Sequence, residues 1–330
     1  MVILGIETSC DETSAAVVKD AQQVLSQVIA SSLKQHAAYG GVIPEIASRA
    51  HLGSITYVVD QAMQEAHVGP GQIDAVAVTQ GPGLIGSLLV GISFAKALGR
   101  GWAKPVIGVN HVKAHLYAAF IEEPPIYPFV GLVVSGGHTS LYKVKKFGSE
   151  DVIGSTRDDA AGEAFDKVAK ILGLGYPGGP IIEKLAQSGR KDAFRFRCDC
   201  SGLDFSFSGI KTAVLYKAQE LKKLYGPLSQ ETTADLCASF QDAVVGDLVA
   251  KAMKAVASCG ARALVVGGGV AYNNYLRGRL SQAVRPGSVK LCVAPKPYCL
   301  DNAAMVASFA ARLPRIQRTC GSVRLDPLLG

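Results

Sequence analysis

The sequence lacks several features that would place it in a well-known class of protein. None of its eight cysteines forms a Cys-x-x-Cys pair, which argues against a structural zinc ribbon. Charged residues make up only 18% of the chain, too few for a solvated, disordered polypeptide. The longest uncharged stretch of interest, residues 81–95, is too short and too rich in glycine to span a membrane. The composition instead predicts a folded protein, because 48% of the residues are apolar, and 330 residues suffice for two domains.

The start of the chain carries no recognisable targeting signal. Met1 is followed at once by an apolar segment, residues 2–6, without a basic region or a cleavage site. We therefore expect a cytoplasmic protein with reduced thiols and no membrane association. The net charge of +7 permits a polyanionic partner such as RNA, although many basic proteins bind no nucleic acid.

A strand–turn–strand pattern occurs twice and indicates duplicated domains. Residues 2–6 and 15–18 are apolar and flank a polar turn, and residues 129–134 and 141–144 repeat that plan. Strands then alternate with helical patterns, which predicts an α/β fold. A proline-rich stretch, residues 122–128, is the best candidate for a linker between the halves. Helices are expected at residues 43–65, 84–98, 111–120, 161–172, 180–188, 232–258 and 301–313.

Two histidines, His111 and His115, stand one turn apart on the predicted helix 111–120. This spacing places both imidazoles on one face, where they could hold a divalent metal or simply belong to a polar surface. A zinc-protease motif needs a glutamate directly after the first histidine as the general base, and Val112 stands there instead. Peptide hydrolysis by that mechanism is therefore disfavoured.

A metal held by these histidines needs a further ligand, for which Asp301 is a candidate. Asp301 stands at the start of the predicted last helix, so it suits either metal coordination or an ordinary N-cap. On the sequence alone the cap is the simpler explanation. A site of two histidines and one carboxylate fits Fe²⁺ and also fits Zn²⁺.

Three glycine-rich loops in the second half could contact a nucleotide. Ser135-Gly-Gly-His138 follows a strand and forms either an anion-binding nest or a plain hairpin turn. Gly267-Gly-Gly-Val270 follows a strand and opens a helix, where phosphates often bind. Gly175-Tyr-Pro-Gly-Gly179 leads into a helix bearing Glu183, whose carboxylate could bind ribose hydroxyls. No Gly-Lys-Ser or Gly-Lys-Thr follows these loops, which excludes a Walker motif. Together the loops favour a nucleotide cleft.

Aromatic and basic residues alternate between residues 194 and 211. The pattern suits a nucleic-acid surface, but it also suits a pair of amphipathic strands with phenylalanines inside and arginines outside. We predict the strand pair for the phenylalanines and leave open whether Arg195, Arg197 and Lys211 contact nucleic acid.

With these segments in view, the chain resembles the bacterial-type tRNA N6-adenosine threonylcarbamoyltransferase family, formerly described as O-sialoglycoprotein endopeptidases. The resemblance covers essentially the whole chain. It rests on Gly5-Ile-Glu-Thr-Ser-Cys-Asp-Glu-Thr13, Gly81-Pro-Gly-Leu-Ile-Gly86, Asn110-His-Val-Lys-Ala-His115, Val134-Ser-Gly-Gly-His-Thr139, Asp158-Asp-Ala-Ala-Gly-Glu-Ala-Phe-Asp-Lys167, Tyr176-Pro-Gly-Gly-Pro180, Leu203-Asp-Phe-Ser-Phe-Ser-Gly-Ile-Lys-Thr-Ala213, Gly267-Gly-Gly-Val-Ala-Tyr-Asn273 and Asp301-Asn-Ala-Ala304.

The resemblance implies two RNase H-like domains of the actin/Hsp70/sugar-kinase (ASKHA) superfold, with a ligand cleft between them. Residues 1–122 would form the N-terminal domain that carries the metal histidines. Residues 127–300 would form the C-terminal nucleotide-binding domain. Residues 301–330 would form a C-terminal helix and tail that pack back toward the N-terminal domain.

The activity implied is an acyl transfer in tRNA modification. A threonylcarbamoyl group moves from threonylcarbamoyl-AMP to the N6 amine of the adenosine 3′ of the anticodon, in tRNAs reading ANN codons. One divalent metal per subunit is implied, Fe²⁺ or else Zn²⁺, and ATP or ADP can occupy the substrate cleft. The implied partners are tRNA, an inactive paralogue that forms a heterodimer, a small P-loop ATPase and an upstream threonylcarbamoyl-AMP synthase. The rival hypotheses are an ATP-dependent sugar or small-molecule kinase of the same superfold and a non-enzymatic ATPase scaffold.

The resemblance also assigns roles to individual residues. His111, His115 and Asp301 would hold the metal. The adenylate would be bound by Val134, Ser135, Gly136, Gly137, His138, Asp166, Gly179, Glu183 and Asn273. Separately from the resemblance, we hypothesise that Glu12 or Asp11 in the first turn takes the proton of the amine.

Overall fold

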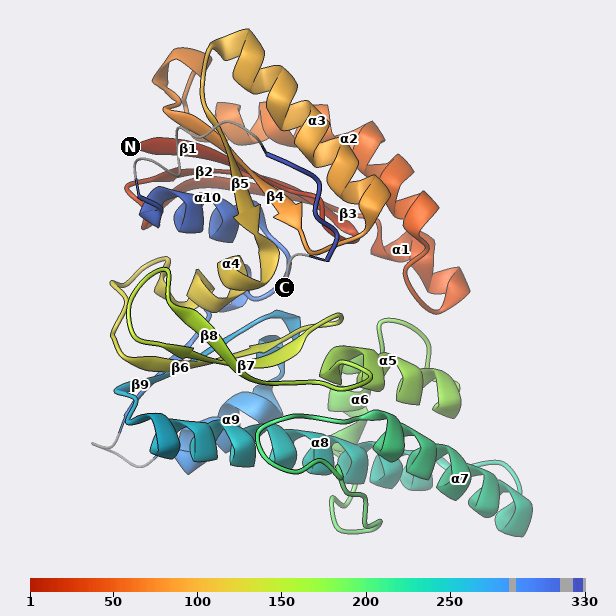
Figure 1. Cartoon of the computed structure of the whole chain (residues 1–330). Helices are drawn as coiled ribbons and strands as arrows, with labels where there is room; N and C mark the ends of the chain where they lie inside the picture. The colour runs from red at the N-terminus through yellow and green to blue at the C-terminus, as the bar shows by residue number, and fades with distance from the viewer. Residues whose placement is uncertain (285–288, 315–322, 329–330) are drawn as a thin grey trace. The chain divides into compact units, whose positions relative to one another are not determined.

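The computed structural model describes residues 1–284, 289–314 and 323–328 (Figure 1). The chain divides into two compact units, one formed by residues 1–125 with residues 294–330 and the other by residues 126–293. Parts of the predicted C-terminal tail, residues 315–322 and 329–330, lie outside the described residues. Among the helices described, none combines the length and the apolar character that a membrane span requires.

The first unit is built on a mixed five-stranded sheet. Its strands are β1 (Val2–Glu7), β2 (Glu12–Lys19), β3 (Gln23–Ser31), β4 (Ala75–Gly81) and β5 (Val106–Asn110), in the order β3-β2-β1-β4-β5. β1 runs antiparallel to β2 and parallel to β4.

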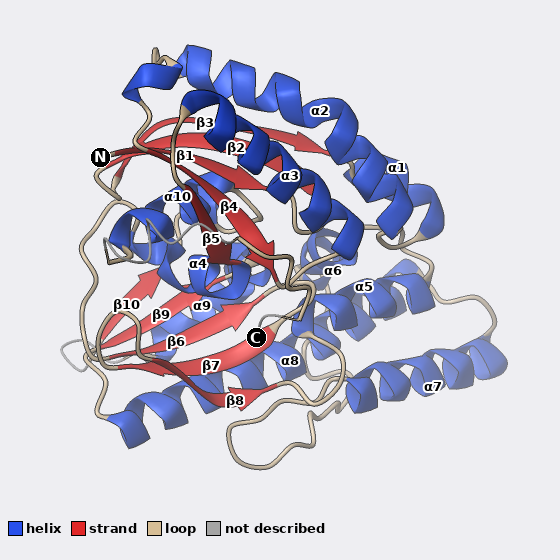
Figure 2. Ribbon diagram, turned by 45° about the horizontal axis from the view of Figure 1, so that its top comes forward, coloured by secondary structure: helices blue, strands red, loops and turns tan. Residues whose placement is uncertain are grey.

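Helices cover both faces of this first sheet. The helices of the first unit are α1 (Leu33–His36), α2 (Pro44–Glu65), α3 (Ile85–Trp102), α4 (His111–Tyr117) and α10 (Ala303–Arg312). α2 and α3 lie on one face, and α10 lies on the other (Figure 2). Because both faces are covered, β1 and β4 are buried over nearly their whole length, which explains their continuous apolar runs.

The second unit repeats the topology of the first. Its strands are β6 (Phe129–Val134), β7 (Thr139–Val144), β8 (Glu150–Ser155), β9 (Ala263–Gly267) and β10 (Lys290–Val293), in the order β10-β9-β6-β7-β8. As in the first sheet, the opening strand pairs antiparallel with the next one and parallel with the fourth. The helices are α5 (Ala161–Leu172), α6 (Gly178–Ala186), α7 (Ser208–Tyr225), α8 (Gln230–Cys259) and α9 (Asn274–Ala283). The predicted α/β class is confirmed.

The predicted strand pair between residues 194 and 211 is wrong. Residues 194–204 form no strand, a single bridge joins Phe205 to Thr156, and α7 begins at Ser208. Phe205 and Phe207 are buried, while Arg195 and Arg197 are exposed. The alternation of aromatic and basic residues therefore reflects which side chains are buried, although the backbone pairs with no neighbouring strand over residues 194–204. The segment instead hydrogen-bonds to a helix, since the amide of Phe194 donates to Ser239 Oγ at 3.1 Å. Lys211 forms an ion pair with Asp159, whose Oδ2 lies 2.8 Å from Lys211 Nζ.

Candidate metal centre and nucleotide loops

The two histidines stand on α4, which directly follows β5: His111 is its first residue, and His115 lies one turn later. The side chain of Asn110 caps this helix by accepting a hydrogen bond from the amide of Lys113 at 2.9 Å, which fixes where the helix begins. His111 is 5% exposed and His115 is 1% exposed, and their ring centroids are 4.6 Å apart. The alternative that they form a polar surface is therefore wrong.

Asp301 faces the two imidazoles. Its Oδ1 lies 2.9 Å from His115 Nε2 and 3.6 Å from His111 Nε2. The alternative N-cap role for Asp301 is wrong, because the next residue, Asn302, caps α10 by accepting from the amide of Met305 at 2.9 Å. The carboxylate of Asp301 is thus directed toward the histidines instead of toward the helix end.

These three side chains suit a divalent metal. One ligand atom from each of His111, His115 and Asp301 lies within 4.8 Å of the others. Buried imidazole nitrogens beside a carboxylate are the donor set of zinc and non-haem iron sites. Nδ1 of His115 is buried without a hydrogen-bond partner among the described residues.

Glu7 contacts the cluster, and the sequence predictions did not assign it a role. Its Oε2 lies 3.1 Å from His111 Nδ1 and accepts from Thr79 Oγ1 at 2.5 Å, while its Oε1 accepts from the amide of Ser9 at 2.6 Å. A carboxylate on Nδ1 orients the imidazole and leaves Nε2 for a metal. The sequence contains a signal for this role, since Glu7 is a charged residue at the end of an otherwise apolar segment, and the structure shows that it is fully buried.

The two histidines of the cluster differ in how readily they are protonated, since the pKa of His111 is raised and that of His115 is lowered. Burial disfavours a charged imidazole at His111, but the carboxylates of Asp301 and Glu7 outweigh that effect and raise its pKa to about 9. Burial lowers the pKa of His115, and the neighbouring His111 lowers it further. Burial opposes ionisation of Glu7, yet His111 holds the pKa of that carboxyl below its usual value. Without a metal, His111 therefore carries a proton that a metal would have to displace.

Of the two residues predicted to accept a proton, Asp11 lies in the turn after β1, and Glu12 is the first residue of β2. Atoms of Cys10, Asp11 and Asp301 lie within 4.8 Å of one another, so Asp11 stands beside the proposed ligand set. Burial raises the pKa of Asp11, and Asp301 raises it further. Ser31 Oγ donates to Glu12 Oε1 at 2.8 Å, while Glu12 Oε2 is buried without a partner among the described residues. Burial raises the pKa of Glu12 to about 7.

The predicted nucleotide residues lie in the second unit. Ser135-Gly-Gly-His138 forms the turn between β6 and β7, in which the Ser135 amide donates to the His138 carbonyl at 2.8 Å. Among the described residues, a Cβ on Gly136 or Gly137 would meet no atom within 4 Å, and neither residue has a positive φ. Gly179 has the same open surroundings. No contact within the described part of the chain requires glycine at these positions, and open space above a backbone suits a bound ligand.

Two of the predicted polar residues, each in the middle of one helix, bind the N-terminus of another helix. Asp166 Oδ1 on α5 accepts from the amide of Gly178 at the start of α6, at 2.7 Å. Glu183 Oε1 on α6 accepts from the amide of Asn274 at the start of α9, at 2.7 Å. Asn273 caps α9 and donates to Gln241 Oε1 at 3.0 Å. Val134 is fully buried in β6. These side chains therefore fix the positions of the loops.

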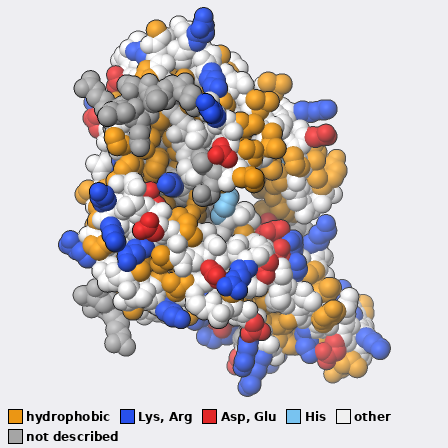
Figure 3. Space-filling view, viewed as in Figure 1, with side chains coloured by type: hydrophobic (Ala, Val, Ile, Leu, Met, Phe, Trp, Pro, Cys, Tyr) orange, Lys and Arg blue, Asp and Glu red, His pale blue; other side chains and the backbone are white. Residues whose placement is uncertain are grey.

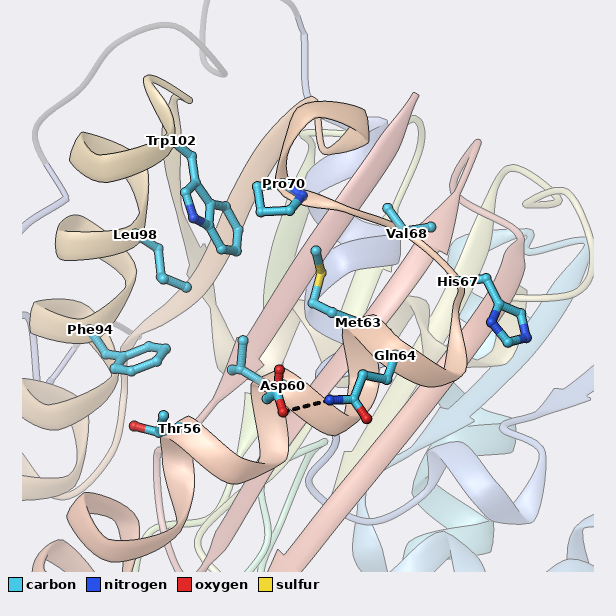
Figure 4. Close-up of a pocket in the computed structure, with 11 residues that line it drawn as sticks. Thr56, Asp60, Met63, Gln64, His67, Val68, Pro70, Phe94, Leu98 and Trp102 are labelled. Atoms are coloured by element: carbon cyan, nitrogen blue, oxygen red, sulfur yellow. Dashed lines mark hydrogen bonds between the residues drawn. The ribbon is translucent and has the colours of Figure 1, made fainter.

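An apolar groove of the first unit lies away from all predicted site residues. It has a volume of about 490 Å³ and lies between α2 and α3. Figure 4 shows Phe94, Leu98 and Trp102 of α3 facing Met63 of α2 across it. Its lining is mostly apolar and includes no residue of the histidine cluster, so it is not the candidate reaction site.

Comparisons with known proteins agree with both the fold and these motifs. Component A of the (R)-2-hydroxyglutaryl-CoA dehydratase of Acidaminococcus fermentans matches with a TM-score of 0.55 at 15% identity, over 94% of this chain and 98% of that one. This likeness shows the fold alone, and it confirms the predicted ASKHA-type architecture.

Sequence relatives are much closer. The tRNA N6-adenosine threonylcarbamoyltransferase of Symbiobacterium thermophilum is 53% identical over 310 residues, which cover 93% of this chain and 90% of that protein. The protein of the same name from Anaeromyxobacter dehalogenans strain 2CP-C is 49% identical over 331 residues, which cover 98% of each. The model of the family TsaD, tRNA N6-adenosine threonylcarbamoyltransferase, matches residues 23–308. The chain therefore belongs to the TsaD family of tRNA N6-adenosine threonylcarbamoyltransferases.

Proposed function

We propose that this chain transfers a threonylcarbamoyl group from threonylcarbamoyl-AMP to the N6 amine of the adenosine 3′ of the anticodon, in tRNAs reading ANN codons. The observation that carries the proposal is the buried cluster of His111, His115 and Asp301 in a chain of this family. The sugar-kinase alternative is not favoured, because relatives at about 50% identity are named tRNA N6-adenosine threonylcarbamoyltransferases.

Family membership implies a metal-dependent enzyme, and the three-residue cluster is the candidate site. We propose that it holds one Fe²⁺ per subunit, with Zn²⁺ as the alternative that metal analysis distinguishes. When bound, the metal would supply Lewis acidity toward the carbonyl of the threonylcarbamoyl group. Glu7 would keep the His111 ring in the orientation in which Nε2 faces the metal.

The second unit would hold the adenylate. We propose that the backbone of residues 134–138 and Gly179 lies against it, because these glycines have open space where a side chain would otherwise stand. Asp166, Glu183 and Asn273 would serve mainly by fixing the loops, given their hydrogen bonds within the protein. We further propose that the first unit, residues 1–125 with 294–330, and the second unit, residues 126–293, are the two RNase H-like domains predicted as residues 1–122 and 127–300.

Proton removal from the amine needs a base that is unprotonated near neutral pH. Glu12, whose pKa is raised to about 7, meets this requirement. Asp11 lies beside Asp301 and is the second candidate. An aromatic amine is a weak nucleophile, so positioning of the two substrates should contribute more than proton transfer.

The family role implies tRNA as a substrate. We propose three protein partners: an inactive paralogue in a heterodimer, a small P-loop ATPase, and a synthase that supplies the adenylate, all in the cytoplasm. Support for the heterodimer comes from apolar side chains on α2 and α3, since Leu52 is 70% exposed, Ile85 60% and Leu89 53%. Figure 3 shows hydrophobic side chains gathered over these helices. Contiguous exposed apolar surface commonly marks a protein interface.

The test is transfer from threonylcarbamoyl-AMP to unmodified tRNA in vitro, with and without the partner proteins. Formation of the modified nucleoside, detected by mass spectrometry, is expected with the partners present. Absence of product in every combination, together with phosphorylation of a sugar by ATP, would instead support the kinase.

A further inference from the structure

The last described segment of the chain, residues 323–328, packs against the first unit. Val323 is 4% exposed and belongs to the apolar core that also contains Val78 and Leu88. The amide of Asp326 donates to the carbonyl of Gln80 at 3.0 Å, and the amide of Gly83 donates to the carbonyl of Pro327 at 3.3 Å. The segment is therefore paired by its backbone with the turn that joins β4 to α3.

This turn lies directly against Ser9. The amide of Leu84 donates to the carbonyl of Ser9 at 2.8 Å. A Cβ on Gly83 would come within 2.6 Å of the same carbonyl oxygen, so the turn can approach Ser9 this closely only with glycine at that position. The positions of Ser9 and of the turn are thus coupled.

Ser9 in turn contacts both His111, at Nδ1, and Glu7, the carboxylate that faces this Nδ1. Its hydroxyl Oγ lies 3.1 Å from His111 Nδ1, and its amide donates to Glu7 Oε1 at 2.6 Å. Ser9 is only 2% exposed, so water cannot readily replace it. A shift of Ser9 would move the imidazole and its carboxylate partner together.

We propose that residues 323–327 form a positioning segment for the metal ligand His111. The segment holds the turn from Gln80 to Leu84 against Ser9, and Ser9 holds His111 and Glu7. This inference rests on the proposed metal site. It predicts that the segment affects metal affinity although none of its residues belongs to the ligand set.

Co²⁺ binding to the full chain, followed by visible absorption and competition with a chelator, tests the proposal. The variant Asp326→Pro removes the amide that bonds to Gln80. The matched control Leu328→Pro removes an amide whose hydrogen bond among the described residues stays local, to Asp326 Oδ1 at 3.3 Å. We expect the Kd for Co²⁺ to rise about 3- to 10-fold in Asp326→Pro and to stay unchanged in Leu328→Pro.

A double-mutant cycle with Ser9→Ala distinguishes positioning from general destabilisation. If the segment acts through Ser9, Asp326→Pro should add little to the loss of Co²⁺ affinity already caused by Ser9→Ala. A chain shortened after residue 322 should show at least the loss of Asp326→Pro. Equal Co²⁺ affinities of Asp326→Pro, the shortened chain and Leu328→Pro would overturn the positioning role alone. Failure of the unaltered chain to bind Co²⁺ at His111 would overturn the metal site itself.

Discussion

The carboxylate of Glu7 and the imidazole of His111 face each other at 3.1 Å, although 104 positions separate them in the chain. β1 ends at Glu7 and β5 ends one residue before His111, so the parallel strands of one sheet deliver both groups to the same edge. Ligand sites commonly form at the carboxyl ends of such strands.

Replacing Glu7 with glutamine should weaken metal binding by about 10- to 100-fold, because the amide keeps the shape of the carboxylate without its charge. The pKa of His111 should also fall from about 9 toward its ordinary value. Chelator competition and a titration of the His111 ring by nuclear magnetic resonance measure the two effects. Glu65→Gln, on the exposed side of α2, is the control. Unchanged metal affinity in Glu7→Gln would contradict the orienting role.

Replacing His111 with alanine should abolish transfer and reduce metal content below one ion per chain. The metal-free variant should keep its circular dichroism spectrum, since β5 and α4 are supported by apolar packing around them. His67→Asn is the control, because His67 is exposed and asparagine tolerates its φ of 55°. Full activity in metal-depleted His111→Ala would refute the metal site.

Metal affinity should rise with pH. Since His111 has a raised pKa of about 9, binding displaces a proton, and affinity should increase about tenfold per pH unit up to that pKa. Stability of the metal-free protein should change in the opposite direction. The stabilisation from protonated His111 is complete below the ordinary pKa of 6.5 and is lost as the pH rises through about 9. Zn²⁺ affinity and urea unfolding between pH 6 and pH 10 measure both. A flat affinity profile would mean that His111 carries no such proton.

Gly137→Ala should impair adenylate binding without harming the fold. Its Cβ would point into open space, so stability should change by less than about 1 kcal/mol, while the KM for threonylcarbamoyl-AMP should rise. Gly162→Ala provides the contrast, because its Cβ would come within 2.7 Å of the Ser135 carbonyl and should destabilise the protein by about 1–3 kcal/mol. Thermal unfolding and steady-state kinetics separate the two. An unchanged KM in Gly137→Ala would argue against a ligand at this turn.

Leu89→Asp should disrupt the proposed heterodimer and leave the isolated chain as stable as before. Leu89 is 53% exposed on α3, so a charge there costs little in the free chain but much in an apolar interface. Analytical ultracentrifugation with the paralogue measures the effect. Tyr225→Asp, at an 80% exposed position of the second unit, is the control. Equal complex formation by both variants would place the interface elsewhere.

The sequence predicted the helices and the histidine pair because these depend on local periodicity. α2, α3, α5 and α8 lie within a few residues of their predicted bounds. It could not decide between metal ligand and helix cap for Asp301, because that choice depends on which side chain reaches the amide of Met305. Glu7 was missed for a related reason, since its partner is distant in the chain.

The segment around Arg195 shows a different limit. Alternation of apolar and basic residues predicts which side chains are buried, and it predicted this correctly for Phe205 and Phe207. A strand also needs a neighbour with free backbone groups, and such a neighbour cannot be read from local pattern. Here an amide of the segment bonds to Ser239 on α8 instead.

The ligand set also bears on how the protein is made. His115 and Asp301 are 186 positions apart, and between them the chain builds the whole of the second unit. A nascent chain that has not passed residue 301 holds both histidines but neither the third ligand nor α10, which covers one face of the first sheet. Capture of the proposed metal would therefore occur only when synthesis is almost complete, so unfinished chains released from the ribosome would not bind it through this ligand set.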